Sequence, residues 1–269
     1  MILNVMLYYS ISCVFSNTEW PVEYKMDNKQ RGYALIFNQE KFAKPKSAKQ
    51  KSAKQRHGTN VDRDNLRERF TALGFRVSVH NDLKEERMMD ELRKAALANH
   101  TDEDCFVCII LSHGKKDHIS AFDKVIEINT ITDQFRGDNC PSLVGKPKIF
   151  IIQACAGSKK DDPVTPMVGG AIHTGIKDPV LYTLPTGADF LMCYSVTEGF
   201  VSYRDPESGG LYIQELCKAL EEHGSTLEFT ELLTLVSMSV SRLEPLEKKQ
   251  MPCFTSMLTK KLYFKPKHE

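Results

Sequence analysis

Short hydrophobic runs alternate along the chain with segments whose apolar residues recur at helical spacing. The runs predict buried strands within 33–37, 75–82, 105–114, 146–157, 188–195 and 252–264. The spaced segments predict helices within 65–74, 83–100, 210–224 and 229–243, the first of them capped by Asn60 or Asp62 and ended by Gly74. Strands that alternate with helices predict a largely parallel sheet whose functional residues gather at the carboxyl ends of its strands.

Two of the expected strands end at residues with catalytic chemistry. Cys155 lies at the end of one strand, and His113 lies at the end of the strand before it. A free thiol has a pKa of about 8.5, so a cysteine hydrolase at neutral pH benefits from a neighbouring histidine that removes and later returns the proton. Gly114 and Gly157 would let the backbone approach a substrate and donate N–H groups to an oxyanion. The alternatives are a small buried cysteine and a structural histidine.

Composition limits the classes of protein and partner. With 269 residues, 41% hydrophobic and 26% charged, the chain can bury a sizeable core as one large or two small domains. The formal net charge of +1 gives no overall attraction to nucleic acid or to an acidic membrane surface. Neither partner is therefore expected.

The cysteines are expected to be free thiols rather than disulfides. Of the eight, Cys105, Cys108, Cys155 and Cys193 lie in apolar runs, and a domain of this size needs no covalent staples, which favours a reducing cytosol. Cys105 and Cys108 form a CxxC pair, but no second pair stands at the spacing of a zinc site. No metal site is predicted from this pair.

Two segments are expected to lie outside the packed core. Residues 1–22 form an apolar leader, expected to be disordered, that lacks the basic region and cleavage site of a signal peptide and is too short for a membrane span. Secretion is the alternative for this leader. Residues 41–56 contain seven basic residues and no acid around a tandem KSAKQKSAKQ, which predicts a solvated loop. The alternative role of this loop is to attract acidic segments or polyanions.

The sequence QACAG at 153–157, with SHG upstream at 112–114, resembles the signature of the caspase family. The resemblance covers about Tyr24 to Phe264 and includes, in caspase order, RGYALIF, RHGTNVDRDNL, DCFVCIILSHG, GKPKIFIIQAC, ADFLMCYS and KKQMPCFTSMLTKKLYF. It implies an α/β, caspase-like three-layer fold with a mostly parallel central sheet and helices on both faces. The implied activity is that of an executioner-type cysteine endopeptidase that cleaves after Asp in apoptosis. A weakly active or inactive homologue that regulates a paralogous caspase is the alternative.

The resemblance assigns catalysis to residues at the ends of the two strands. Cys155 is the expected nucleophile, and His113 is the expected general acid and base. The backbone N–H groups of Gly114 and Cys155 are expected to form the oxyanion hole. No cofactor and no metal ion is expected, and the implied partners are protein substrates with Asp before the cleaved bond.

The residues expected to bind the substrate are Arg56, Gln153, Ser202, Tyr203, Arg204 and Asp205. Arg56, Gln153 and Arg204 match the family's clamp on the substrate aspartate, because two guanidinium groups and an amide satisfy a desolvated carboxylate. Ser202 would lie on the strand beside the substrate peptide. Without the resemblance, Arg56 is more simply a solvated charge, and Arg204 is a loop arginine that pairs with Asp205 or Glu207.

Three positions depart from the caspase pattern. Ala156 stands where Arg, Gln or Gly is usual, so a polar or flexible link of the active-site loop is missing. Val201 replaces an aromatic residue, and Tyr203 replaces a His or Trp. The last two are expected to weaken or broaden selection of the second residue before the cleaved bond.

The resemblance also divides the chain into a large subunit region at 23–160, a linker at 161–181 and a small subunit region at 182–269, which form one composite catalytic domain. In the linker, Asp162 and Asp178 are each followed by proline, which makes a poor scissile bond, and Asp161 is the less obvious site. Slow activation is therefore expected. The final strand would be an exposed edge in a monomer, and a homodimer, formed of large and small subunit pairs after processing, would cover it. The expected location is the cytoplasm, with the nucleus as a second compartment.

Overall fold

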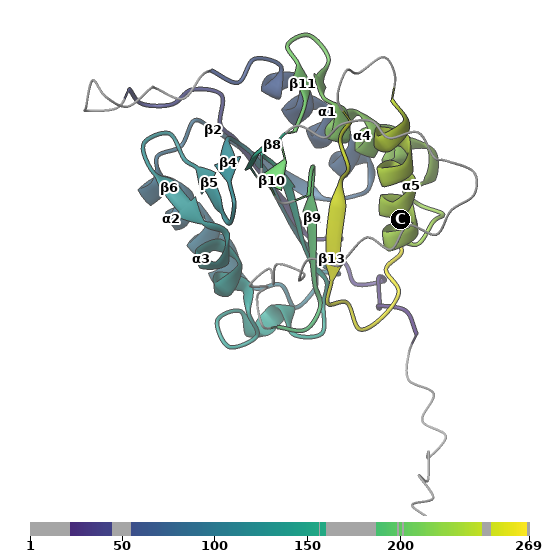
Figure 1. Cartoon of the computed structure of the whole chain (residues 1–269). Helices are drawn as coiled ribbons and strands as arrows, with labels where there is room; N and C mark the ends of the chain where they lie inside the picture. Colours follow the sequence, from purple (N-terminus) through teal and green to yellow (C-terminus); the bar gives the residue numbers. More distant parts are fainter. Residues whose placement is uncertain are drawn as a thin grey trace, which may run out of the picture.

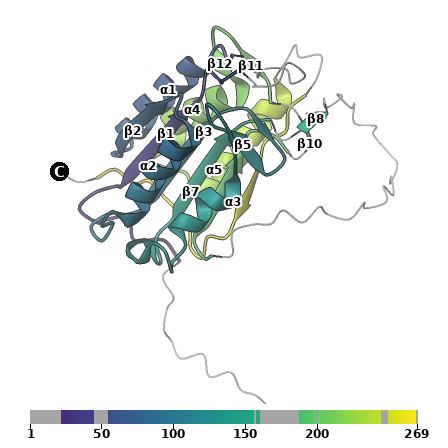
Figure 2. The same ribbon diagram turned by 90° about the vertical axis from the view of Figure 1, so that its left-hand side faces the viewer.

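The computed structural model describes residues 22–44, 55–155, 157–159, 187–197, 199–200, 202–243 and 249–267. Its centre is a six-stranded sheet in the order β13-β9-β7-β3-β1-β2, whose strands are labelled in Figures 1 and 2 taken together. These strands are β1 (Tyr33–Asn38), β2 (Arg76–Asn81), β3 (Phe106–Leu111), β7 (Lys148–Gln153), β9 (Phe190–Tyr194) and β13 (Cys253–Ser256). Neighbouring strands are parallel except β13, which runs antiparallel to β9. The predicted, mostly parallel sheet is thus confirmed.

Helices cover both faces of this sheet (Figures 1 and 2). One face packs against α1 (Thr59–Ala72), α4 (Leu211–His223) and α5 (Phe229–Arg242), and the other against α2 (Glu85–Leu97) and α3 (Ile128–Thr132). Each layer buries an apolar stripe, represented by Leu66 and Phe70 on α1 and by Met88 and Leu92 on α2. The predicted three-layer α/β fold is confirmed.

The two central strands are buried along their whole length because both faces of the sheet are covered. Alternate residues therefore enter separate cores, with Val107 and Ile109 in one and Phe106 and Cys108 in the other. This arrangement explains the unbroken hydrophobic runs of the sequence. Cys105 belongs to the first core, so the two thiols of the CxxC pair lie in different layers. The described residues contain no group of three or more potential metal ligands.

The first helix begins earlier than the sequence predicted. It starts at Thr59, directly after Gly58, whose φ of 84° is left-handed. Asp62 does not cap the helix, because its carboxylate accepts a hydrogen bond from the backbone N–H of Gly210 at 2.7 Å. The prediction of a cap at Asn60 or Asp62 was therefore wrong. The Asp62 side chain, which the capping preference assigns to the helix terminus, instead accepts a hydrogen bond from a residue distant in the sequence.

Short strands form three smaller sheets that the sequence did not predict. The first contains β4 (Gly114–Lys115), β5 (His118–Ser120) and β6 (Val125–Glu127). The others pair β8 (Gly157–Lys159) with β10 (Gly199–Phe200) and β11 (Arg204–Asp205) with β12 (Gly209–Gly210). Two 3-10 turns, Asp133–Phe135 and Pro141–Leu143, follow α3. Strands this short have no readable period.

β13 forms one edge of the central sheet and, within the described chain, pairs only with β9. The sequence predicted a final strand within 252–264, and the structure limits it to the four residues Cys253–Ser256. None of the helices in the described ranges has the length and apolar character needed to cross a bilayer.

Several sequence predictions fall outside the described residues. These are the leader up to residue 21, most of the basic segment (45–54), the linker at 161–181, Ala156 and Val201. The expectations attached to these positions stay predictions.

Candidate active site

A hollow of about 250 Å³ lies at the carboxyl ends of β3 and β7. Its lining consists of Arg56, Ser112, His113, Gln153, Ala154, Cys155, Ser202, Tyr203 and Arg204. The structure therefore brings together seven of the nine site residues that the sequence predicted. Gly114 lies next to this lining, and Asp205 lies outside it.

The register of the central sheet places His113 and Cys155 side by side. Leu111 of β3 is paired with Gln153 of β7, and the Ser112 N–H donates to the Gln153 carbonyl at 3.1 Å. His113 and Cys155 each lie two residues beyond that pair, on parallel strands that end together. Parallel pairing thus delivers a histidine and a thiol to one edge of the sheet, where ligands of open α/β sheets bind.

Cys155 differs in its exposure from Cys105, Cys108 and Cys193, which are buried. It is partly exposed, and its Sγ lies 3.9 Å from the Ser202 carbonyl oxygen. In contrast, burial raises the pKa of the Cys105, Cys108 and Cys193 thiols well above the ordinary value, which keeps those thiols protonated. Cys155 is therefore accessible to a substrate where the others are inert core residues. All seven described cysteines are free.

The Phe42 ring and strand β5 of a small sheet both contact His113. Its imidazole packs against Phe42, with ring centroids 4.8 Å apart and planes tilted by 41°. Its carbonyl accepts the Ser120 N–H at 2.8 Å, which ties the residue to β5. These contacts fix both the backbone and one face of the imidazole, so the ring is oriented before a substrate binds.

Arg56 is buried, contrary to the view of it as a solvated charge. It is 1% exposed, and its Nη1 donates to Thr59 Oγ1 at 2.6 Å and to the Gln39 carbonyl at 3.3 Å. Its Nη2 lies 3.4 Å from the Gln153 carbonyl oxygen, and its Nε is buried with no hydrogen-bond partner. Burial and the nearby positive charge of Arg204 lower the pKa of Arg56 to about 9.

Gln153 presents a second unsatisfied polar atom at the same place. Its Nε2 donates to Ser202 Oγ at 3.0 Å, whereas its Oε1 is buried with no hydrogen-bond partner. Native proteins satisfy the great majority of buried polar atoms, so two unsatisfied atoms on neighbouring residues indicate a site that a ligand completes. The Arg56 Nε–H is a charged donor that suits an anionic ligand, whereas the Gln153 Oε1 is an acceptor that suits a ligand N–H or O–H group.

Arg204 reaches the hollow from β11. Its Nε donates to the His57 carbonyl at 2.7 Å, and burial lowers its pKa. In the alternative interpretation Arg204 pairs with Asp205, but the Asp205 carboxylate accepts hydrogen bonds from the N–H groups of Glu207 and Ser208 at 2.9 and 2.8 Å. Asp205 is exposed and stabilises its own turn, and its contact with substrate stays a prediction.

Sequence reasoning missed a residue that supports the strand beside the hollow. Gln250 accepts the Tyr203 N–H on its Oε1 at 2.7 Å and donates from Nε2 to the Ser195 carbonyl at 2.7 Å. The residue is 1% exposed, and it ties the 202–204 segment to the end of β9. A lone glutamine in a polar segment gives no sequence signal for this bridging role.

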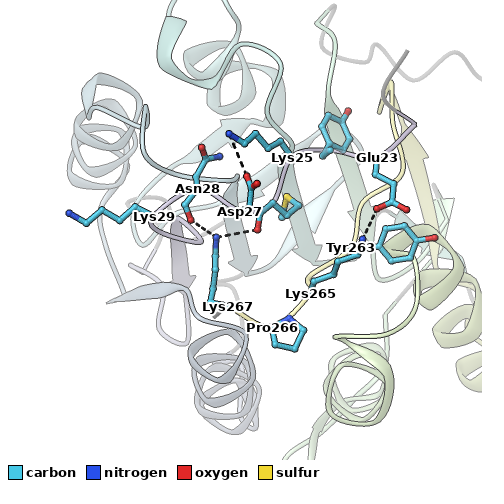
Figure 3. Close-up of a pocket in the computed structure, with 11 residues that line it drawn as sticks. Glu23, Lys25, Asp27, Asn28, Lys29, Tyr263, Lys265, Pro266 and Lys267 are labelled. Atoms are coloured by element: carbon cyan, nitrogen blue, oxygen red, sulfur yellow. Dashed lines mark hydrogen bonds and ion pairs between the residues drawn. The ribbon is translucent and has the colours of Figure 1, made fainter. Parts of the chain in front are cut away.

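A larger hollow of about 580 Å³ lies elsewhere, between the 23–29 segment and the 263–267 segment (Figure 3). Most of its charged side chains already have partners: Lys25 pairs with Asp27, Lys265 pairs with Glu23, and Lys267 donates to the Asn28 carbonyl at 2.7 Å. No cysteine, histidine or serine lines it. The larger hollow thus lacks a cysteine nucleophile and a histidine base, whereas the smaller one contains both Cys155 and His113, so the smaller hollow is the candidate active site.

The smaller hollow combines a partly exposed thiol, a neighbouring histidine and two arginines. This arrangement can perform nucleophilic hydrolysis of an anionic substrate by a cysteine.

Comparison with known proteins identifies the class. The family model described as the caspase domain matches residues 31–263. The chain is 50% identical over 275 residues to Caspase-6 of Mus musculus, covering 97% of both chains, and 41% identical over 251 residues to Caspase-7 of Gallus gallus, covering 90% of this chain and 80% of that one. Among solved structures, Caspase-1 from Spodoptera frugiperda is similar at a TM-score of 0.79 and 35% identity, covering 92% of this chain and 95% of that chain.

The chain belongs to the caspase family, so it is a cysteine endopeptidase with a role in apoptosis. Within the family it is similar to caspase-6. The predicted family and type of enzyme are confirmed, and the alternative of a weakly active or inactive homologue that regulates a paralogous caspase is not favoured.

Proposed function

We propose that the chain cleaves peptide bonds after an aspartate residue, with Cys155 as nucleophile and His113 as general acid and base. His113 accepts the thiol proton, Sγ bonds to the substrate carbonyl carbon, and His113 returns the proton to the amine that leaves as the C–N bond breaks. Water then attacks the thioester, His113 accepts a proton from that water, and the C–S bond breaks to release the acid. The backbone N–H groups of Gly114 and Cys155 donate to the oxyanion in both steps.

The observation that favours aspartate is the buried Nε–H of Arg56, a donor that has no hydrogen-bond partner. Arg56 lines the same hollow as Arg204 and Cys155, so two guanidinium groups lie beside the thiol. A carboxylate that enters the hollow accepts charge-assisted hydrogen bonds and relieves the repulsion between the two guanidinium groups.

The segment at Ser202 and Tyr203, which lines the hollow and leads into β11, supports a peptide substrate. Main-chain pairing along this segment would add the substrate as a further strand, with the thiol beside its carbonyl. Tyr203 and the neighbouring Val201 would form part of the wall for the second residue before the cleaved bond. Asp205 is the weakest of the proposed contacts, since it is exposed and already holds its own turn.

The test is hydrolysis of an acetyl-Val-Glu-Ile-Asp reporter by the processed chain. Cys155→Ala and His113→Ala are expected to lose at least about a thousandfold in kcat, because nucleophile and base act as one unit. Cys253→Ala is the matched control, since Cys253 is also a free, partly exposed cysteine and lies outside the hollow. Equal hydrolysis by wild type and Cys155→Ala would end the proposal.

We also propose that the active form is a homodimer of large and small subunit pairs, built from regions 23–160 and 182–269. Support comes from β13, whose outer edge has no partner strand within the described chain, since an uncovered edge strand promotes association. Sedimentation of the processed protein is expected to give the mass of two copies. A monomer that retains full activity would contradict this.

Activation is proposed to require another protease or slow cutting, because Asp162 and Asp178 both precede proline. Incubation of purified protein is expected to leave the linker largely intact, and rapid autocatalytic cutting after Asp178 would contradict the proposal. The proposed location is the cytoplasm, with access to the nucleus. Seven free cysteines among the described residues and a net charge of +1 support a reducing compartment without nucleic acid or membrane as partner. A fluorescent fusion of the chain would test its location.

A further inference from the structure

The carboxylate of Asp62 is buried next to the hollow without lining it. The residue is 0% exposed and lies in the first turn of α1. Its Oδ1 accepts the Gly210 N–H at 2.7 Å, and its Oδ2 has no hydrogen-bond partner. An ionised carboxylate loses its hydration on burial, so this position destabilises the fold unless nearby positive charge compensates it.

The compensating charges belong to the two arginines of the hollow. Arg56 and Arg204 both lower the pKa of Asp62, but burial outweighs them and raises it to about 7. In return, Asp62 opposes the lowering of both arginine pKa values that burial causes. The remaining titratable group that faces Asp62 is Cys217 on α4, whose buried thiol is neutral because its pKa is raised to about 12. Asp62 thus favours the charged form of both guanidinium groups before substrate binds.

Asp62 also forms part of the joint between α1 and the β11–β12 hairpin. Arg204 of β11 donates to the His57 carbonyl, and Gly210 of β12 donates to Asp62, so both strands of the hairpin contact the amino end of α1. The fit is close, since a Cβ on Gly209 would lie 2.2 Å from Asp62 Oδ1. The hairpin that contains Arg204 is therefore seated on this carboxylate.

We propose that Asp62 is a positioning residue of the aspartate pocket, whose carboxylate seats the β11–β12 hairpin on α1 and thereby places Arg204 at the hollow. The inference rests on the proposed function, in which Arg204 contacts the substrate carboxylate. Asp62 does not touch the substrate and acts through the arginines. Its loss therefore weakens binding of an aspartate substrate more than it slows the chemical step.

The test measures kcat and KM separately on the acetyl-Val-Glu-Ile-Asp reporter. Asp62→Ala is expected to raise KM about tenfold with kcat within about twofold of wild type. Asp62→Asn retains an oxygen that accepts the Gly210 N–H, so it is expected to recover most of the lost affinity. Asp189→Ala is the matched control, because Asp189 is also buried and accepts from Tyr24 Oη at 2.6 Å but lies outside the hollow. A purely structural role would make both alanine variants alike.

An unchanged KM in Asp62→Ala, or a loss confined to kcat, overturns the inference. If the alanine variant does not fold, Asp62→Leu fills the same space without an acceptor and is judged by the same criterion. Arg204→Ala separates the two proposals. A normal KM in Arg204→Ala contradicts the proposed pocket itself, whereas a raised KM in Arg204→Ala with a normal KM in the Asp62 variants contradicts only this inference.

Discussion

Gly114 and Cys155 lie so close that a Cβ on Gly114 would stand 2.8 Å from the Cys155 carbonyl oxygen. The same Cβ would stand 2.8 Å from Ala154 Cβ and 3.0 Å from the His118 carbonyl oxygen. None of these atoms is the end of a flexible side chain, so the backbone itself would have to shift. Both N–H groups proposed for the oxyanion belong to this pair, and their spacing therefore depends on a residue without a side chain.

Gly114→Ala is accordingly expected to lower kcat by about a hundredfold or more, the usual cost of misplacing an oxyanion donor. Gly137→Ala is the control, because its Cβ would meet only Val144 Cγ2 at 3.1 Å, far along the chain from the reacting groups. Steady-state hydrolysis of the aspartate reporter and thermal unfolding of both variants provide the measurements. Full activity in a folded Gly114→Ala would show that the oxyanion lies elsewhere.

Arg56→Lys is expected to raise KM for the aspartate reporter about tenfold or more and to change kcat less. Lysine keeps the positive charge but loses the planar fork, so the contacts to Thr59 and Gln39 and the free Nε donor cannot all be replaced. Arg69→Lys is the matched control, since Arg69 pairs with Glu221 at 3.0 Å outside the hollow. A KM equal to that of wild type in Arg56→Lys would exclude Arg56 from the substrate clamp.

The sequence could predict the elements whose signal is local. β3 and β7 follow directly from apolar runs, because a strand covered on both faces has no polar alternation. α2 follows from the spacing of Met88, Leu92 and Ala96, all buried in the structure. The positions of Cys155 and His113 follow in turn, since parallel strands end at a common edge.

The sequence could not predict features that depend on contacts between distant segments. Arg56 ends a basic run, and nothing local indicates that the fold buries it. Asp62 lies near the start of a helix, where Asp commonly caps, yet its carboxylate accepts a hydrogen bond from the N–H of Gly210, which is far along the chain. Asp205 is expected at the substrate from the family resemblance alone, and nothing local predicts that its carboxylate accepts the N–H groups of Glu207 and Ser208.

A buried ion pair between His100 and Glu103 is expected to make stability fall in alkaline solution. His100 Nδ1 lies 2.6 Å from Glu103 Oε2, and Nε2 lies 2.8 Å from the Ala95 carbonyl oxygen. Burial opposes the charged ring, but hydrogen bonds to Cys140, Glu103 and Ala95 together outweigh it and raise the pKa of His100 to about 9. The stabilisation is therefore complete below the unfolded pKa of about 6.5 and is lost as the pH rises through about 9.

Urea unfolding of His100→Gln against wild type at pH 6 and pH 9.5 tests this pair. The difference in unfolding free energy between the two proteins is expected to shrink by on the order of 2 kcal/mol toward the higher pH. His223→Gln, at an exposed position near the end of α4, is expected to show no comparable change. A pH-independent difference for His100→Gln would mean that the ring is neutral in the folded protein.

Burial of the Asp62 carboxylate is expected to make the free energy of unfolding of the wild-type protein depend on pH. Burial raises its pKa from an ordinary 3.8 to about 7, against the Gly210 N–H and the two arginines that lower it. Between these values the folded state binds the proton more tightly than the unfolded state does. Protonated Asp62 therefore stabilises the fold at low pH, and this contribution to the free energy of unfolding is lost as the pH rises through about 7.

Asp62→Asn removes that loss, because the amide is neutral at every pH. Its unfolding free energy relative to wild type is expected to increase between pH 4.5 and pH 8 by more than about 1.4 kcal/mol, the equivalent of one pKa unit. Asp64→Asn, on the same helix, is the control: its carboxylate bonds to Arg63, which lowers its pKa, so it stays ionised across this range in both states. A parallel course for wild type and Asp62→Asn would place the Asp62 pKa at its ordinary value. Two results together would show that the Asp62 carboxylate serves the substrate pocket at the expense of stability. Asp62→Asn would be more stable than wild type at neutral pH, and Asp62→Ala would bind the aspartate substrate more weakly.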